Sequence, residues 1–297
     1  MDFTNHLFYL AYKIGLEIVF LDTSNQQRIM NSVSKSKHNV TITGNLEAEK
    51  TIVFGNGFGT DQTAFQQITP AFKDNYRILM YDNIGAGTTD AAAFDPVRYN
   101  SIHAYASDLI SILDEYGLKN VIYIGHSVSG MIGLLASVKR PELFERLILL
   151  AASARYLNDA DEAYTGGFDQ QTLDDLYTTM KNNYHAWASG FASMVMSNPD
   201  HPHLAEKFAG TLEALRPDIA LIVAKVIFQS DHRRELAKVK HPVLIVQTKD
   251  DVAVPMEASE YLHQHINGSS YKVINAIGHL PHVSAPDEVI EAIRSFI

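Results

Sequence analysis

The sequence predicts an α/β fold in which helices cover both faces of a mostly parallel sheet. Short runs of β-branched and aromatic residues alternate with helical segments along most of the 297 residues, the order found in parallel sheets. Between two of these strands, residues 155–231 contain several helical segments and no convincing strand. An all-helical insertion between two sheet strands predicts a lid of four helices over a site on the sheet.

Seven segments are predicted strands, because each is a short β-branched or aromatic run bounded by turn-forming residues. They are residues 40–43, 51–54, 76–81, 121–124, 147–150, 243–247 and 271–275. The first alternates only weakly between apolar and polar residues, so we expect it at the edge of the sheet. The predicted core is residues 30–154 together with residues 232–297.

The predicted helices follow from apolar residues that recur with helical spacing. In the core they are residues 62–72, 101–116, 257–265 and 287–297, with a further helix beginning after residue 127. In the lid they are residues 171–183, 185–197, 204–215 and 218–229, separated by glycine and proline.

Composition and charge exclude several classes of function. The net charge is −10 and is not concentrated in a tail, which argues against nucleic acid or an anionic membrane as the main partner. The chain contains no cysteine, which excludes disulfides, a thiol nucleophile and cysteine-ligated metals. This composition fits a reducing compartment, and we expect a cytoplasmic protein.

The N-terminal stretch is predicted to lie outside the fold. Residues 7–21 are largely apolar, but Lys13 and Glu17 interrupt them and the run is too short to span a bilayer. No basic residue precedes this run and no cleavage pattern follows it, so we expect no signal peptide. Met30 opens an ordinary N-terminal segment, and residues 1–29 are predicted to be an extension.

The segment from Val121 to Met131 carries the strongest chemical signal in the chain. A buried strand ends at Gly125, Ser127 follows, and small residues then open a helix. A serine on a sharp strand-to-helix turn is the nucleophile elbow of the α/β-hydrolase fold. The usual pattern has glycine two residues after the serine, where this chain has Ser129.

An acid and a base follow the serine in the order that this fold requires, Ser, then Asp or Glu, then His. The loop after the strand at 243–247 supplies Asp250 and Asp251, and the loop after the last strand supplies His279 and His282. Carboxyl ends of parallel strands meet at one edge of a sheet, so these side chains are expected near Ser127. We favour Asp251 and His279, with Asp250 and His282 as the alternatives.

The oxyanion hole of such a site needs two N–H donors. The residue after the serine, Val128, supplies one, and Phe58 in the glycine-rich loop 55–59 is expected to supply the other. This loop does not fit a dinucleotide motif, because Thr60 stands where that motif requires glycine. No metal or organic cofactor is expected, and the histidine pairs at 201/203 and 263/265 lack the motif of a zinc site.

Motifs along the chain resemble one family of small α/β-hydrolases. This family includes the sigma-B stress regulator RsbQ of bacilli and the plant karrikin and strigolactone receptors. The resemblance spans roughly residues 38–297, and the similar stretches are Gly57-Phe-Gly-Thr-Asp-Gln62, Gly125-His-Ser-Val-Ser129, Arg155-Tyr-Leu-Asn-Asp159, Gly166-Gly-Phe168, Ser230-Asp-His232, Asp251-Val-Ala-Val-Pro255 and Gly278-His-Leu-Pro-His282.

The resemblance implies the triad Ser127, Asp251 and His279, with oxyanion donors at Phe58 and Val128. It also implies a four-helix lid over a deep apolar pocket, whose aromatic residues fall on Phe168, Trp187, Phe191, Phe208 and Phe228. One departure is Asn56, where the family usually has histidine, and it concerns the support of the oxyanion loop.

Two functions remain compatible with these residues. The first is a serine hydrolase that cleaves a small, mainly apolar ester or lactone. The second is a ligand-sensing signalling protein in which hydrolysis is slow or incidental and a regulatory protein is the partner. Both functions need the same triad and pocket, so the sequence does not separate them.

Overall fold

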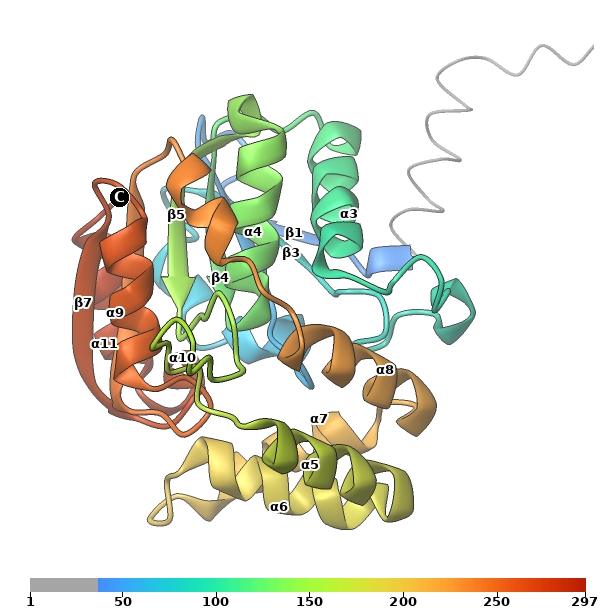
Figure 1. The fold of residues 1–297 in the computed structure, drawn as a ribbon. Coiled ribbons are helices and arrows are strands. Elements are labelled where there is room, and N and C mark those ends of the chain that lie inside the picture. Colours follow the sequence, from blue (N-terminus) through green and yellow to red (C-terminus); the bar gives the residue numbers. More distant parts are fainter. Residues whose placement is uncertain (1–36) are drawn as a thin grey trace, which may run out of the picture. The chain divides into compact units, whose positions relative to one another are not determined.

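The computed structural model describes residues 37–297, which form a seven-stranded sheet with helices on both faces (Figure 1). The strand order is β1-β3-β2-β4-β5-β6-β7, and only β1 runs antiparallel to its neighbour. Residues 1–29, the predicted extension, lie outside the described part of the chain. The strands are β1 (Thr41–Gly44), β2 (Thr51–Gly55), β3 (Arg77–Tyr81), β4 (Val121–His126), β5 (Phe144–Leu150), β6 (Val243–Asp250) and β7 (Ser270–Ile277).

The predicted alternation of strands and helices is confirmed, and so is the edge position of the first strand. The central strands are apolar throughout because both faces of the sheet are covered. Successive side chains of a strand point to opposite faces, and in β2 Val53 joins one hydrophobic cluster while Ile52 and Phe54 join the other. The sheet therefore separates two cores.

Four helices cover these two cores. One core contains side chains of α3 (Ile102–Glu115), α4 (Val128–Lys139) and α9 (Met256–His265). The other core contains side chains of α11 (Pro286–Arg294) and of two short 3-10 turns. The short helices between the main elements are η3 (Ala91–Ala93), η4 (Pro141–Leu143), η5 (Arg233–Lys238) and α10 (Pro281–Ser284).

The predicted helix at residues 62–72 is wrong. The structure has two separate 3-10 helices there, η1 (Gln62–Phe65) and η2 (Thr69–Ala71). Pro70 lies in the second of them, and it cannot donate the backbone hydrogen bond that a continuous helix requires at that position. The apolar spacing that suggested a helix buries Phe65, Ile68 and Phe72 against the sheet instead.

The four predicted lid helices are present between β5 and β6, each within two residues of its predicted ends. They are α5 (Gln170–Asn182), α6 (Tyr184–Met196), α7 (Pro202–Glu213) and α8 (Pro217–Phe228). Side chains of Asp169 and Asn183 accept hydrogen bonds from the first turns of α5 and α6, while α7 and α8 begin with proline, which is favourable at a first helical position. We call residues 155–231 the lid.

Figure 1 shows the lid beyond the carboxyl end of the sheet, the end to which the arrow of β5 points. None of the helices in the described range 37–297 is long and apolar enough to cross a membrane.

Candidate active site

Ser127 lies between the end of β4 and the start of α4, on a sharply bent backbone. Its φ and ψ are 54° and −124°, a conformation that few residues other than glycine adopt. The Ser127 N–H donates to the carbonyl of Leu150 on the neighbouring strand (2.8 Å), which holds the bend in place. The turn is also closely packed against the start of α4. A Cβ at Gly125 would lie 2.4 Å from the Ser129 carbonyl oxygen, so this position requires glycine.

The structure brings Ser127, His279 and Asp251 together in one chain of hydrogen bonds. The Ser127 Oγ lies 2.8 Å from Nε2 of His279, and Nδ1 of His279 lies 2.8 Å from Oδ2 of Asp251. All three residues are buried. The other Asp251 oxygen accepts the N–H groups of Ala253 (2.9 Å) and Val254 (3.0 Å), which fixes the carboxylate.

The two alternatives left by the sequence lie elsewhere. Asp250 is exposed, and its backbone carbonyl accepts the N–H of Gly278 (2.7 Å). The His282 ring is fully buried and stacks on Phe65, with ring centroids 4.9 Å apart. Neither nitrogen of His282 has a hydrogen-bond partner among the described residues, and burial, with a contribution from the nearby His279, lowers its pKa to about 3. His282 is therefore a neutral packing residue.

The glycine-rich loop 55–59 lies directly against the serine. A Cβ at Gly57 would be 3.3 Å from the Ser127 Cβ and 2.4 Å from Nδ1 of His126, so only glycine permits this approach. Phe58 lines the same cavity as Ser127, and Val128 is the first residue of α4, where backbone N–H groups have no partner within the helix.

The two departures from the expected motifs contact each other in the structure. The Ser129 hydroxyl donates to the carbonyl of Asn56 (2.6 Å), and Asn83 Nδ2 donates to the same carbonyl (3.1 Å). The Asn56 amide donates in turn to the carbonyl of Thr60 (2.5 Å). The loop 55–59 is thus held by the Asn56 side chain from within and by the Ser129 and Asn83 side chains from outside.

The cavity next to Ser127 and His279 is narrow and is lined mostly by apolar side chains. Of the predicted pocket aromatics, Phe191, Phe208 and Phe228 line it. The other two are not among the lining residues and lie behind it. Phe168 packs on Phe228 with ring centroids 5.3 Å apart, and Trp187 stacks on Phe191 at 5.2 Å.

Several lining residues were not predicted from the sequence. Val195, Ile227, Ala253 and Leu280 contribute aliphatic surface, and their spacing carries no signal of its own. Tyr156 is the more informative omission, since its hydroxyl lies 3.2 Å from the Ser127 Oγ. It stands in the stretch Arg155–Asp159, just beyond the carboxyl end of β5. That position at the sheet edge is the only signal that could have found it.

No group of three or more histidine, aspartate or glutamate side chains within residues 37–297 is arranged to hold a metal ion. The His263 ring bonds to the Ser269 hydroxyl and the His265 ring bonds to the Tyr261 carbonyl, each at 2.9 Å.

Comparisons with known proteins agree with this geometry. A family model described as alpha/beta hydrolase fold matches residues 50–286. This chain belongs to the α/β-hydrolase family. One solved structure, described as a hydrolase from Oleispira antarctica, superimposes on the present protein with a TM-score of 0.85. The two are 30% identical, and the match covers 89% of this chain and 96% of the Oleispira chain.

Two plant proteins are similar to this hydrolase in sequence over nearly their whole length. The Petunia hybrida protein karrikin insensitive 2 receptor CA is 47% identical over 266 residues, 89% of this chain and 97% of its own. The strigolactone esterase D14 of Arabidopsis thaliana is 40% identical over 264 residues, 87% of this chain and 98% of its own. The resemblance to the family of karrikin and strigolactone receptors is thereby confirmed.

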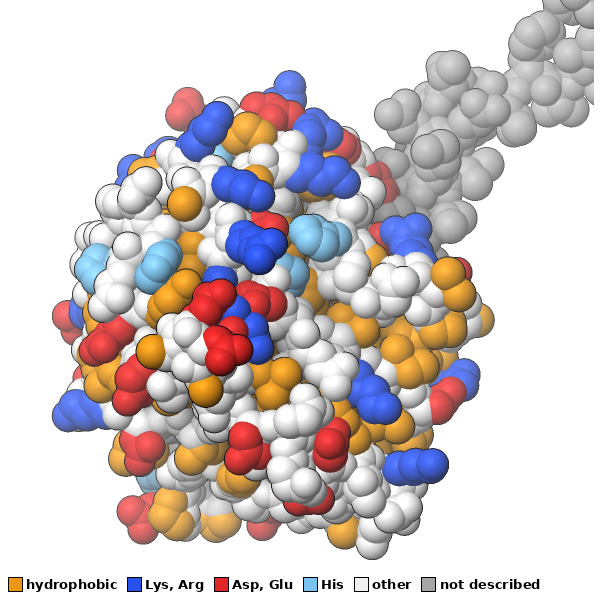
Figure 2. Space-filling view, viewed as in Figure 1, with side chains coloured by type: hydrophobic (Ala, Val, Ile, Leu, Met, Phe, Trp, Pro, Cys, Tyr) orange, Lys and Arg blue, Asp and Glu red, His pale blue; other side chains and the backbone are white. Residues whose placement is uncertain are grey.

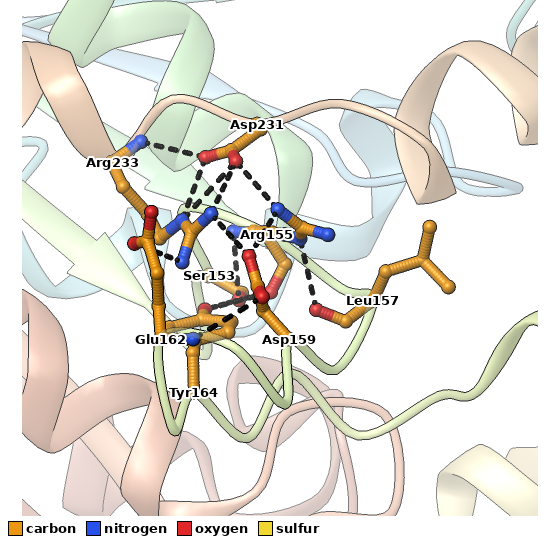
Figure 3. Close-up of polar contacts among 8 residues, drawn as sticks. All are labelled: Ser153, Arg155, Leu157, Asp159, Glu162, Tyr164, Asp231 and Arg233. Carbon is orange, nitrogen blue, oxygen red and sulfur yellow. Dashed lines mark hydrogen bonds and ion pairs between the residues drawn. The ribbon is translucent and has the colours of Figure 1, made fainter.

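The base of the lid in this hydrolase is fastened by a cluster of ion pairs (Figure 3). Arg155 lies where the chain leaves the core, and Asp231 and Arg233 lie where it returns. Arg155 Nη1 is 2.8 Å from Asp231 Oδ2, and Arg233 Nη2 is 2.7 Å from the same oxygen and 2.9 Å from Asp159 Oδ2. Burial of Asp231 opposes ionisation, but the hydrogen bonds from both arginines outweigh it and lower its pKa to about 2.

The lid of the hydrolase also contacts the loop that carries His279. The N–H of His279 donates to the carbonyl of Val195 in α6 (2.8 Å), and the Asn198 amide donates to the carbonyl of Ile277 (3.1 Å). A Cβ at Gly278 would lie 2.1 Å from the Met196 carbonyl oxygen. The imidazole position therefore depends on where the end of α6 lies.

The lid is strongly acidic. Residues 155–231 contain eleven acidic and five basic side chains. Figure 2 shows acidic side chains over the lower part of the molecule, where Figure 1 places the lid. This charge disfavours anionic ligands near the cavity.

Removing Arg233 should destabilise the fold. Its side chain is 8% exposed and bonds to three carboxylates, of Asp159, Glu162 and Asp231. We expect Arg233→Ala to lower the free energy of unfolding by about 2 kcal/mol, a figure reduced for the exposure of two of these partners. Thermal denaturation measures this. Arg234→Ala removes the adjacent exposed arginine and should leave the melting temperature unchanged; equal losses in both variants would contradict the role of the cluster.

Acid should destabilise the protein through buried His282. Its folded pKa of about 3 lies below the unfolded value of about 6.5. The unfolded chain therefore binds more protons between these values, and stability falls as pH falls, by about 2 kcal/mol between about pH 6.5 and about pH 5. His282→Leu should flatten this part of the stability profile measured by denaturant titration. Parallel profiles for parent and variant would count against this assignment.

Proposed function

We propose that this protein is a serine hydrolase that cleaves a small, mainly apolar ester or lactone. The single observation that carries the proposal is the hydrogen-bonded chain of Asp251, His279 and Ser127, with both links at 2.8 Å, on the floor of an apolar cavity. A carboxylate, an imidazole and a hydroxyl in this order constitute the machinery of acyl transfer.

Each residue of the triad has a distinct role in the proposed first half-reaction. The Ser127 Oγ attacks the carbonyl carbon, and its proton passes to Nε2 of His279. Asp251 holds the imidazole in the orientation that leaves Nε2 free to accept that proton, and it stabilises the imidazolium that forms. The tetrahedral intermediate collapses when the ester C–O bond breaks and His279 protonates the departing alcohol oxygen.

The second half-reaction releases the acid. Water loses a proton to His279 as it attacks the acyl carbon, and the bond between that carbon and the Ser127 Oγ then breaks. In both halves the carbonyl oxygen becomes an oxyanion, for which the backbone N–H groups of Phe58 and Val128 are the proposed donors. Donors aimed at developing charge in a site shielded from water are an effective source of catalysis.

The cavity supports a restricted class of substrate. Its lining is mostly apolar, and the lid around it is acidic. A neutral, mainly apolar ester or lactone satisfies both conditions. The 40% identical Arabidopsis relative is itself named an esterase, which is consistent with this substrate class.

Replacement of the nucleophile tests the proposal directly. Ser127→Ala should reduce hydrolysis of a short p-nitrophenyl ester by about 10⁴-fold or more, as expected when a triad nucleophile is removed. Ser137→Ala is a matched control, because Ser137 is a buried serine further along α4 whose hydroxyl, among residues 37–297, bonds only to the Leu134 carbonyl. If the Ser127→Ala protein retains activity within tenfold of the parent, the assignment is wrong.

A second candidate function is ligand sensing with slow turnover and a protein partner. The observation that favours it is the direct bonding of the His279 loop to Val195 in α6 and to Asn198 just after that helix, because a ligand at the triad could then alter the lid. The 47% identical Petunia relative is named a receptor. In this case the changed surface of the lid would be what a partner protein recognises.

Turnover and ligand-induced stabilisation together separate the two functions. A sensor should turn over less than about once per minute, far below the roughly 10 s⁻¹ typical of enzymes, and a bound lactone should raise its melting temperature strongly. A metabolic hydrolase should show fast turnover. The Ser127→Ala protein, which retains the cavity, serves as the control that measures ligand stabilisation without hydrolysis; no stabilisation in that variant would exclude the sensor.

A further inference from the structure

A hydroxyl group outside the triad touches the nucleophile. The Tyr156 Oη lies 3.2 Å from the Ser127 Oγ, and the same Oγ lies 2.8 Å from Nε2 of His279. Tyr156 is buried and lines the same cavity as the triad. Its hydroxyl has no other hydrogen-bond partner recorded among the described residues, so its polar group is directed at the serine.

The hydrogens in this arrangement can be assigned from the chemistry of the groups. A carboxylate only accepts, so Nδ1 of a neutral His279 donates to Asp251, and Nε2 is left as an acceptor. The Ser127 hydroxyl then donates its one hydrogen to Nε2. The hydrogen between Ser127 and Tyr156 must therefore come from the tyrosine, and burial raises the pKa of Tyr156 above its ordinary value, which keeps that hydrogen in place.

We propose that Tyr156 is a catalytic residue of the second half-reaction, in which it hydrogen-bonds the Ser127 Oγ as this atom leaves the acyl carbon. The inference rests on the proposed hydrolase function. When the bond between the acyl carbon and Oγ breaks, both electrons of the bond stay on Oγ. His279 Nε2 returns a proton to Oγ, and Tyr156 donates a hydrogen bond to it without losing its own proton.

The same hydrogen bond has the opposite effect in the first half-reaction. There Oγ is the nucleophile that attacks the substrate carbonyl. A hydrogen bond donated to Oγ stabilises its lone pair and so lowers its nucleophilicity. Tyr156 therefore favours release of the acyl group over its capture. This asymmetry distinguishes a chemical role from a packing role, because a packing residue would affect both steps alike.

The surroundings of Tyr156 hold its hydroxyl in position. The ring edge packs on Phe228 with centroids 5.4 Å apart, and the Tyr156 carbonyl accepts the N–H of Phe168 (3.0 Å). The preceding residue, Arg155, is fixed to Asp231 at the base of the lid. Tyr156 and its neighbour Arg155 thus contact residues of the lid from Phe168 to Asp231. The contact of Tyr156 with Ser127 therefore depends on the position of the lid.

The test is pre-steady-state hydrolysis of p-nitrophenyl acetate by parent, Tyr156→Phe and Tyr177→Phe proteins. This ester has a good leaving group, so the burst of p-nitrophenol reports acyl capture and the steady rate reports release. Tyr177 is the matched control, since it is another buried lid tyrosine whose hydroxyl has no partner among the described residues and which does not line the cavity. Rapid quench followed by intact mass measures the acetylated fraction.

Tyr156→Phe should slow release by about tenfold to a hundredfold, the effect of losing one hydrogen bond to a charged group. The burst rate should stay equal to that of the parent or rise, and acetylated protein should accumulate. Tyr177→Phe should match the parent in both steps. Unchanged release in Tyr156→Phe, or equal loss in burst and release, would overturn the proposal.

Failure of the underlying function has a different signature. The hydrolase proposal itself fails if the parent shows no burst, or if its acetylation persists in the Ser127→Ala protein. The proposal for Tyr156 then fails with it. If the parent is acetylated at Ser127 and only the Tyr156 comparison is negative, the hydrolase function stands and Tyr156 has no role in release.

Discussion

The site depends on one constraint, which is that three loops spread over about half of the chain lie at the same edge of a parallel sheet. Ser127 follows β4, Asp251 follows β6 and His279 follows β7, and the sheet places these strands in the order β4-β5-β6-β7. Because the strands are parallel, their carboxyl ends share one edge. The 2.8 Å links between the three side chains are possible only in that arrangement.

The turn at Ser127 and the glycine-rich loop 55–59 are joined by hydrogen bonds. The strained backbone of Ser127 is stabilised by its bond to Leu150. Ser129, which stands where the elbow pattern expects glycine, bonds to Asn56, which stands where the family usually has histidine. This bond to the Asn56 backbone joins the turn at Ser127 to the loop that carries Phe58.

The lid contacts the hydrogen-bonded chain of Ser127 and His279 at two places. At its base, ion pairs between Arg155, Asp231 and Arg233 fasten both ends of the lid next to Tyr156. At its far side, the end of α6 bonds to the backbone of His279. A ligand that shifts the lid must disturb one of these contacts, which gives both the hydrolytic and the sensing function a physical basis in the same residues.

The sequence alone determined the fold class, the strand order along the chain, the four lid helices and Ser127, and it favoured Asp251 and His279 over Asp250 and His282, a choice that the structure decided. Local patterns carry these features: apolar runs make strands, and the Ser, Asp, His order follows from the loops after them. The broken helix at 62–72, the place of Trp187 and Phe168 behind the cavity, and the hydroxyl of Tyr156 beside Ser127 were decided only by tertiary structure. They depend on which side chains from distant segments meet, and no spacing within one segment records that.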